Sequence, residues 1–147
     1  MAYYLVQHGK AHAKENDPEQ GLTEEGIQET LKIGQLLLSK TSNINMICHS
    51  GKKRAEQTAS IFGEQLGLEN KVKPIDGIQP MDDVECFAGL LVKNTLIVSH
   101  LPFLEKLTNY LVSHNADMKP NVVDYSNSHV VCLEKNALGG FQIAWIL

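Results

Sequence analysis

Residues 3–9, Tyr3-Tyr4-Leu5-Val6-Gln7-His8-Gly9, join a short β-rich run to polar residues and a glycine. Aromatic and β-branched side chains favour a strand over 3–6, and the residues at 7–9 predict its end. The polar segment 10–21, which contains a proline and a glycine, is expected to be a loop. These features predict that a buried strand delivers His8 to an edge of a sheet.

Beyond this stretch, the chain alternates helical and strand-like patterns. Thr23 has the chemistry of a helix N-cap, with Glu24 and Glu25 in the first turn, and predicts a helix to about Ser39. Further along we expect strands over 43–48, 71–75 and 94–99, and helices over 52–68 and 82–91 and from the turn that contains Pro102. The core-facing residues of the helix over 52–68 are expected to be Ala55, Thr58, Ala59, Phe62 and Leu66.

The last segment has a different pattern. Residues 128–135 and 141–147 flank Asn136-Ala-Leu-Gly-Gly140, a combination typical of a β-hairpin. The whole pattern predicts an α/β fold with three layers (α/β/α), in which helices cover both faces of a mostly parallel sheet and a hairpin completes its C-terminal part. No repeat, linker or low-complexity tract divides the chain, so residues 1–147 are interpreted as one domain.

Composition excludes several classes of protein. The formal charge is −4, which disfavours binding to the phosphate backbone of nucleic acids. No apolar run is long enough to span a bilayer, and the first eight residues do not resemble a signal peptide, so we expect a cytoplasmic protein that binds no membrane. Cys48, Cys86 and Cys132 are scattered and odd in number, and are interpreted as reduced core thiols.

Polar residues follow three of the predicted strands. His8 ends the first, His49 and Ser50 end the second, and His100 ends the strand over 94–99. Arg54, the only arginine among thirteen basic residues, begins the helix after the second strand. Because ligands of parallel sheets bind outside the carboxyl ends of the strands, these residues are predicted to meet at one site.

Four strings in this order resemble a known family. They are Gln7-His8-Gly9, Leu22-Thr23-x-x-Gly26, Arg54-Ala-Glu-Gln-Thr-Ala59 and Ser99-His100-Leu-Pro102. The chain resembles the histidine phosphatase superfamily, with its phosphoglycerate-mutase-like fold, and most of all the SixA-type phosphohistidine phosphatases. The resemblance extends over essentially the whole chain.

The resemblance implies a catalytic mechanism for three residues. His8 is the implied nucleophile that becomes a phosphohistidine, and a neutral imidazole suits this role near pH 7. Arg54 is implied to bind two phosphoryl oxygens with its planar fork. His100 is implied to stabilise transition-state charge or to pass a proton. Such catalysis requires neither a metal ion nor a cofactor.

Four further residues are expected to contact the substrate, namely Gln7, Gly9, His49 and Ser50. Gly9 is expected to let the backbone pass close to the phosphoryl group. Gln7 departs from the family pattern, which has arginine before the nucleophile, and its loss of charge is expected to weaken phosphate binding by about 1.5–3 kcal/mol. The other histidines, His12, His114 and His129, are interpreted as structural rather than as metal ligands.

The sequence also offers carboxylates as possible proton donors. Asp82, Asp83 and Glu85 lie where larger family members supply an acid, but they are interpreted as solvated charges near a helix start. A phosphohistidine needs less protonation than an ester because its N–P bond is labile. We therefore predict a metal-independent phosphatase of phosphohistidine on a partner protein, and the resemblance implies a histidine-containing phosphotransfer domain.

Two alternatives remain open from the sequence. The first is a phosphatase of small phosphate esters or anhydrides that uses the same nucleophile. The second is a non-catalytic phosphate-binding module that has lost turnover because Gln7 replaces an arginine.

Overall fold

The computed structural model describes residues 2–147 and contains one six-stranded sheet. The strand order is β3-β2-β4-β1-β5-β6. The strands are β1 (Ala2–Gln7), β2 (Met46–His49), β3 (Val72–Pro74), β4 (Thr95–Ser99), β5 (Val130–Lys135) and β6 (Phe141–Ile146). The helices are α1 (Glu24–Lys40), α2 (Lys53–Leu66), α3 (Val84–Ala88) and α4 (Phe103–Ser113), with a 3-10 turn η1 at Glu69–Lys71.

The pairing of the strands places their ends together. β3, β2, β4 and β1 run parallel, while β5 pairs antiparallel with β1, and β6 pairs antiparallel with β5. Gln7 is opposite Ser99, and His49 is opposite Val98. The carboxyl ends of β1, β2 and β4 therefore meet at one edge of the sheet, as the sequence predicts.

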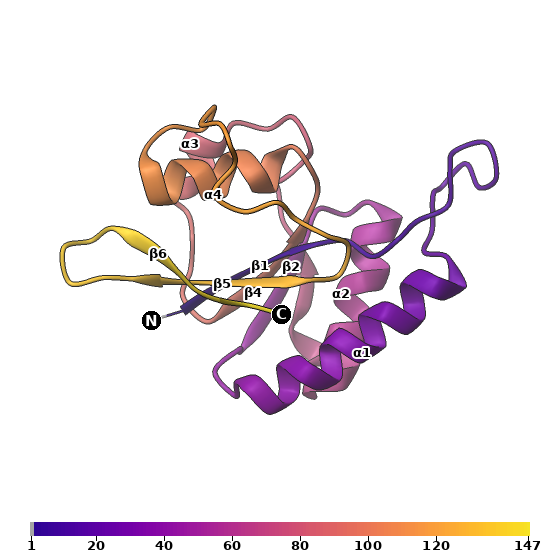
Figure 1. Cartoon of the computed structure of the whole chain (residues 1–147). Helices are drawn as coiled ribbons and strands as arrows, with labels where there is room; N and C mark the ends of the chain where they lie inside the picture. The colour runs from indigo at the N-terminus through magenta and orange to yellow at the C-terminus, as the bar shows by residue number, and fades with distance from the viewer. Residues whose placement is uncertain (1) are drawn as a thin grey trace.

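The sheet lies between two helical layers (Figure 1). α1 and α2 cover one face, and the shorter α3 and α4 cover the other. The loop over 10–21 extends beyond the sheet near the start of α1. This three-layer arrangement, with a C-terminal hairpin of β5 and β6, confirms the predicted fold class. None of the helices between residues 2 and 147 is long and apolar enough to cross a membrane.

Local features of the sequence predicted the start of α1 correctly. Thr23 is its N-cap and accepts a hydrogen bond from the backbone N–H of Gly26 at 2.9 Å. Glu24 and Glu25 occupy the first turn, where carboxylates favour the positive end of the helix dipole. The helix ends at Lys40, one residue beyond the expected end.

Four predictions about local structure were wrong. β2 begins at Met46 rather than at residue 43, and Pro102 is the residue before α4 rather than part of its first turn. The helix expected over 82–91 extends only over Val84–Ala88, because Gly89 ends it and glycine disfavours helix continuation. Cys86 is exposed on this short helix, so only two of the three cysteines are core thiols.

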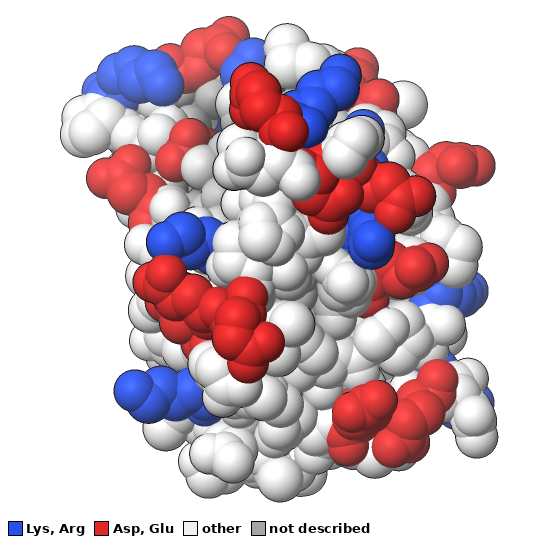
Figure 2. Space-filling view, turned by 90° about the vertical axis from the view of Figure 1, so that its right-hand side faces the viewer, with Lys and Arg blue, Asp and Glu red and all other residues white. Residues whose placement is uncertain are grey.

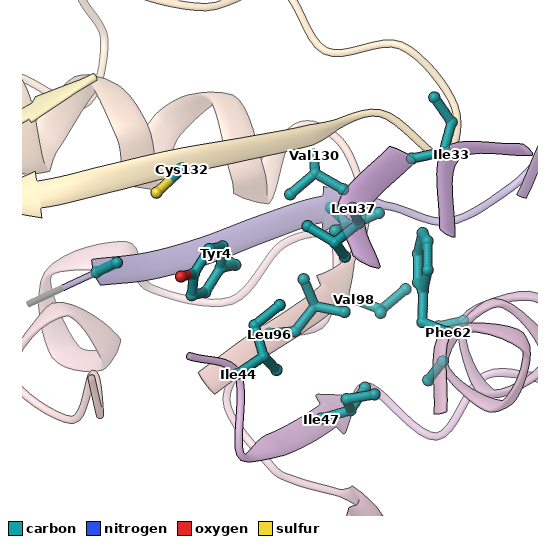
Figure 3. Packing of buried hydrophobic residues seen from close by; sticks show 14 residues of the cluster. Tyr4, Ile33, Leu37, Ile44, Ile47, Phe62, Leu96, Val98, Val130 and Cys132 are labelled. Carbon is teal, nitrogen blue, oxygen red and sulfur yellow. The ribbon is translucent and has the colours of Figure 1, made fainter. Parts of the chain in front are cut away.

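The core under α1 and α2 follows the predicted face of α2. Ala55, Thr58, Ala59 and Phe62 are buried there, whereas Leu66 only packs at the margin. Figure 3 shows the Phe62 ring beside Val98 and Leu37 at the end of the sheet that carries the polar residues. Helix α2, which contains Arg54, is thus anchored to the sheet by apolar packing.

Removal of the Phe62 ring is expected to destabilise the protein. Phe62 is fully buried, so Phe62→Ala leaves a cavity and should lower the free energy of unfolding by about 3–5 kcal/mol. Urea denaturation followed by circular dichroism measures this loss. Ser60→Ala, at an exposed position of the same helix, is the control and should change stability by less than about 0.5 kcal/mol. A similar loss in both variants would contradict this account of the core.

Candidate active site

Three segments bring His8, Arg54 and His100 together. His8 follows β1, Arg54 lies in the first turn of α2, and His100 follows β4. The imidazole rings of His8 and His100 have centroids 5.1 Å apart. Arg54 Nε donates a hydrogen bond to His8 Nε2 at 3.3 Å. The meeting of these side chains agrees with the geometry expected from the strand ends.

The hydrogen bonds of His8 define which nitrogen is free to react. His8 Nδ1 lies 2.8 Å from the carbonyl oxygen of Gly9, which can only accept, so Nδ1 carries the proton. The lone pair of His8 Nε2 therefore faces Arg54. Burial lowers the pKa of His8 below its usual 6.5, and the charge of Arg54 acts in the same direction. The ring is thus a neutral imidazole with its basic nitrogen directed at a guanidinium.

Gly9 has a packing reason to be glycine. A Cβ at this position would lie 2.8 Å from Thr30 Oγ1 and 3.0 Å from Ser128 Oγ, both of which are buried. Its N–H donates to Thr58 Oγ1 at 2.8 Å, which ties the turn after β1 to α2. Packing alone therefore requires glycine here, and contact of its backbone with a phosphoryl group stays a prediction.

His100 lies beside the His8 ring in a buried position. Its Nε2 is 2.6 Å from Ser50 Oγ, and its Nδ1 has no hydrogen-bond partner among residues 2–147. Burial lowers the pKa of His100 to about 3, and the nearby charges of Arg54 and Lys52 act in the same direction. His100 is therefore neutral at physiological pH and can act by hydrogen bonding rather than as a fixed positive charge.

Gln7, which precedes His8 in the sequence, carries a neutral amide. It is the last residue of β1, and its Oε1 is buried without a hydrogen-bond partner in the described part of the chain. Its backbone carbonyl accepts from the N–H of Ser128 at 2.8 Å. A buried amide oxygen without a partner is unfavourable, and the expected contact of Gln7 with substrate stays a prediction.

The His49 side chain forms a hydrogen bond with the backbone of the loop after β2. It is 3% exposed, and its Nδ1 accepts from the N–H of Gly51 at 3.1 Å. Gly51 has a φ of 90°, a conformation that favours glycine. Burial lowers the pKa of His49, although the charge of Glu56 opposes this effect. His49 therefore positions the loop that carries Ser50, while its expected contact with substrate stays a prediction.

Two residues that position the site were not anticipated from the sequence. Gln79 Nε2 donates to the Ser50 carbonyl at 2.7 Å, and Asn127 Nδ2 donates to the His8 carbonyl at 2.9 Å. Both lie in irregular segments and belong to no sequence motif. The only available signal was the general tendency of functional polar residues to occur in loops.

The carboxylates near α3 are occupied by backbone contacts. Asp82 Oδ2 accepts from the N–H of Gln79 at 2.8 Å, and Asp83 Oδ1 accepts from the N–H of Glu85 at 3.0 Å as the N-cap of α3. Asp82 thus stabilises a turn, and Asp83 caps a helix. The sequence analysis expected only solvated charges near a helix start. Glu85 is exposed on α3.

The three histidines interpreted as structural belong to other segments of the chain than His8 and His100. His12 is exposed in the loop over 10–21, His114 is the C-cap of α4, and His129 Nδ1 contacts the Leu147 carbonyl at 2.6 Å. Within residues 2–147, no three His, Cys, Asp or Glu side chains gather closely enough to hold a metal ion.

Buried neutral histidines make stability depend on pH. A histidine whose pKa is lowered by folding takes up its proton in the unfolded chain first, so stability falls as the pH drops below about 6.5. His100, with a pKa near 3, should contribute up to about 1.4 kcal/mol per pH unit between about pH 6 and 4.5. His100→Gln should flatten the pH dependence of the urea midpoint, whereas His12→Gln should leave it unchanged. Equal slopes in all three proteins would refute this expectation.

A cleft of about 420 Å³ adjoins the site on the side of Arg54. Its lining residues are Lys14, Pro18, Glu19, Gln20, Gly51, Lys52, Lys53 and Arg54. Acidic and basic side chains are mixed over the face turned toward the viewer in Figure 2. Attraction of an anion on this side therefore depends on individual side chains near Arg54 rather than on a broad field.

Comparisons with known proteins show which family the sequence matches. The family model described as histidine phosphatase superfamily (branch 1) matches residues 3–79. The phosphohistidine phosphatase SixA of Escherichia coli (strain K12) is 28% identical over 121 residues, covering 77% of this chain and 73% of that protein. The SixA homolog of Haemophilus influenzae is 30% identical over 122 residues, covering 73% of this chain and 74% of that protein.

Solved structures share the fold along the entire chain. The protein histidine phosphatase SixA complexed with tungstate has a TM-score of 0.84 at 21% identity, over 100% of this chain and 96% of that one. A phosphoserine phosphatase of Entamoeba histolytica, in complex with 3-phosphoglyceric acid, has a TM-score of 0.72 at 16% identity, over 99% of this chain and 95% of that one. At these identities the matches show a common architecture and leave the substrate open.

Proposed function

Because the chain belongs to the histidine phosphatase superfamily, branch 1, we propose that it is a phosphohistidine phosphatase that acts on a partner protein. The similarity supports a phosphatase hydrolase in general, and the named SixA relatives favour phosphohistidine as the substrate. The observation that carries the proposal is His8 Nε2, unprotonated and 3.3 Å from Arg54 Nε, with the His100 ring beside it.

The proposed reaction has two displacements at phosphorus. His8 Nε2 attacks the phosphoryl group, the N–P bond to the partner's histidine breaks, and the partner's imidazole retains or takes up a proton from water. Water then attacks the phosphorus bound to His8, the Nε2–P bond breaks and its electron pair returns to Nε2. The proton of the attacking water passes to solvent or to the inorganic phosphate that is released. Arg54 binds the phosphoryl oxygens in both steps, and His100 donates a hydrogen bond to the charge that develops on them.

The state of the nearby carboxylates favours phosphohistidine over an ester. An alkoxide leaving group requires a proton donor, whereas Asp82 and Asp83 are held by backbone N–H groups. A phosphorylated imidazole whose other ring nitrogen carries a proton leaves as neutral imidazole, a much weaker base than an alkoxide, without such help. Asp82 and Asp83, the carboxylates that the sequence offered as donors, thus serve as turn and cap acceptors, which supports a substrate with a labile N–P bond.

The test is incubation with a histidine-containing phosphotransfer domain phosphorylated on its histidine. We expect phosphorus NMR to show the phosphohistidine signal replaced by inorganic phosphate, with no added metal and with a chelator present. Phosphoserine and a panel of phosphorylated metabolites serve as comparison substrates. Faster hydrolysis of a small ester would favour the first alternative, and phosphate binding without turnover on any substrate would favour the non-catalytic module.

A further inference from the structure

The site has a shortage of positive charge around the phosphoryl position. A phosphoryl group carries close to two negative charges at neutral pH. Arg54 is the only arginine in the chain, Gln7 is neutral, and His100 is neutral because burial lowers its pKa to about 3. One guanidinium would then face a dianion, which leaves part of its charge unbalanced.

The lysines near the site differ in whether they form ion pairs with carboxylates. Lys10 Nζ pairs with Glu25 at 2.7 Å, and Lys53 Nζ pairs with Glu19 at 2.9 Å. Lys52 takes part in none of the ion pairs found in the described part of the chain. It is exposed and lines the same cleft as Arg54. Its charge is therefore available to a ligand.

The backbone of Lys52 is joined to the site. Lys52 is the N-cap of α2, two residues before Arg54, and its N–H lies 3.4 Å from Ser50 Oγ. Ser50 Oγ in turn contacts His100 Nε2 at 2.6 Å. Burial is the main cause that lowers the pKa of His100, and the charge of Lys52 is the smallest of the causes that act in the same direction. Lys14 lines the cleft too, but it belongs to the loop over 10–21 and has no such link.

We infer that Lys52 supplies the second positive charge that binds the phosphoryl group, in the role that a second arginine would otherwise have. This inference rests on the proposed function, since it concerns the same pocket. A lysine acts as a point charge on a flexible stem and binds phosphate without the fixed fork of arginine. Lys52 is thus a substrate-binding residue at the mouth of the site.

Binding of tungstate, a tetrahedral dianion, tests the inference without any need for turnover. By isothermal titration calorimetry at low salt, Lys52→Gln should weaken binding roughly three- to tenfold, which is modest because the lysine is exposed. Lys53→Gln removes the same charge from the neighbouring residue, which pairs with Glu19, and should change affinity less than twofold. The loss in Lys52→Gln should shrink at 0.5 M salt.

Rescue variants distinguish charge from structure. Lys52→Arg should retain tungstate affinity, and Gln7→Arg added to Lys52→Gln should restore it because an arginine at position 7 returns the missing charge. Gln7→Arg alone should tighten binding. Urea denaturation should show equal stability for wild type and Lys52→Gln, since the side chain is exposed.

The outcomes separate this inference from the proposed function. Unchanged tungstate affinity in Lys52→Gln, or an equal loss in Lys53→Gln, overturns the role of Lys52 even if the protein hydrolyses phosphohistidine. Selective loss in Lys52→Gln supports that role even if no phosphohistidine substrate is turned over. Absence of tungstate binding by the wild-type protein overturns the anion pocket and the inference together.

Discussion

His8→Ala is expected to abolish phosphatase turnover, with a loss of at least about 10³-fold. The variant lacks the unprotonated Nε2 that faces Arg54. The His100 ring offers no replacement, because its Nε2 contacts Ser50 Oγ and its Nδ1 is buried. The rate is measured as the release of phosphate over time from a phosphorylated histidine-containing phosphotransfer domain. His12→Ala, at an exposed histidine four residues away, is the matched control and should keep wild-type activity.

The covalent intermediate gives the same prediction an independent readout. Wild-type protein denatured during turnover should carry phosphate that is labile in acid and stable in base, the behaviour of a phosphohistidine. Peptide mapping should locate this phosphate on His8, and the His8→Ala protein should carry none. Full activity of His8→Ala, or a phosphate found on another residue, would exclude His8 as the nucleophile.

Arg54→Lys is expected to lower kcat/KM by about 10²–10³-fold although the charge is kept. A lysine has no planar fork and would therefore lose the bidentate contact that we propose for Arg54 with the phosphoryl group. Arg54→Gln should cost still more because charge and fork are both lost. Initial rates on the phosphorylated partner, with kcat and KM separated, measure both effects.

The controls for Arg54 address folding and geometry. Its side chain is only half-buried, so urea denaturation should show nearly wild-type stability for both variants. Equal activity of Arg54→Lys and wild type would show that charge alone suffices and would remove the bidentate role. Equal loss in Arg54→Lys and Arg54→Gln would assign the whole effect to geometry.

Much of the candidate site was predictable because its signals are local. Histidine or a His-Ser pair directly after an apolar, β-rich run indicates a strand end, and parallel strands place such ends at one edge. Arg54 was predictable because the apolar spacing of α2 begins with Ala55 and continues through Phe62. His8, Arg54 and His100 were therefore assigned to one site without any knowledge of distances.

Other features were not predictable because they depend on segments packed from distant parts of the chain. The bond from Asn127 to the His8 carbonyl joins residues 119 positions apart. The contact of Gln79 with the loop after β2 joins two irregular segments that have no periodicity. Gln7 Oε1 is buried without a hydrogen-bond partner among residues 2–147, which depends on what surrounds the end of β1 and has no sequence signature.

By itself, the sequence determined the order of strands and helices, the cap of α1 and the strand ends that bear His8 and His100, because each depends on neighbouring residues. Tertiary structure alone decided the tautomer of His8, the contact of Ser50 with His100 and which lysines pair with carboxylates. Lys53 does so, whereas Lys52 has no ion pair among residues 2–147. The physical reason is that hydrogen bonds and ion pairs act over a few ångströms, so they exist only once distant segments have been brought together by packing of the core.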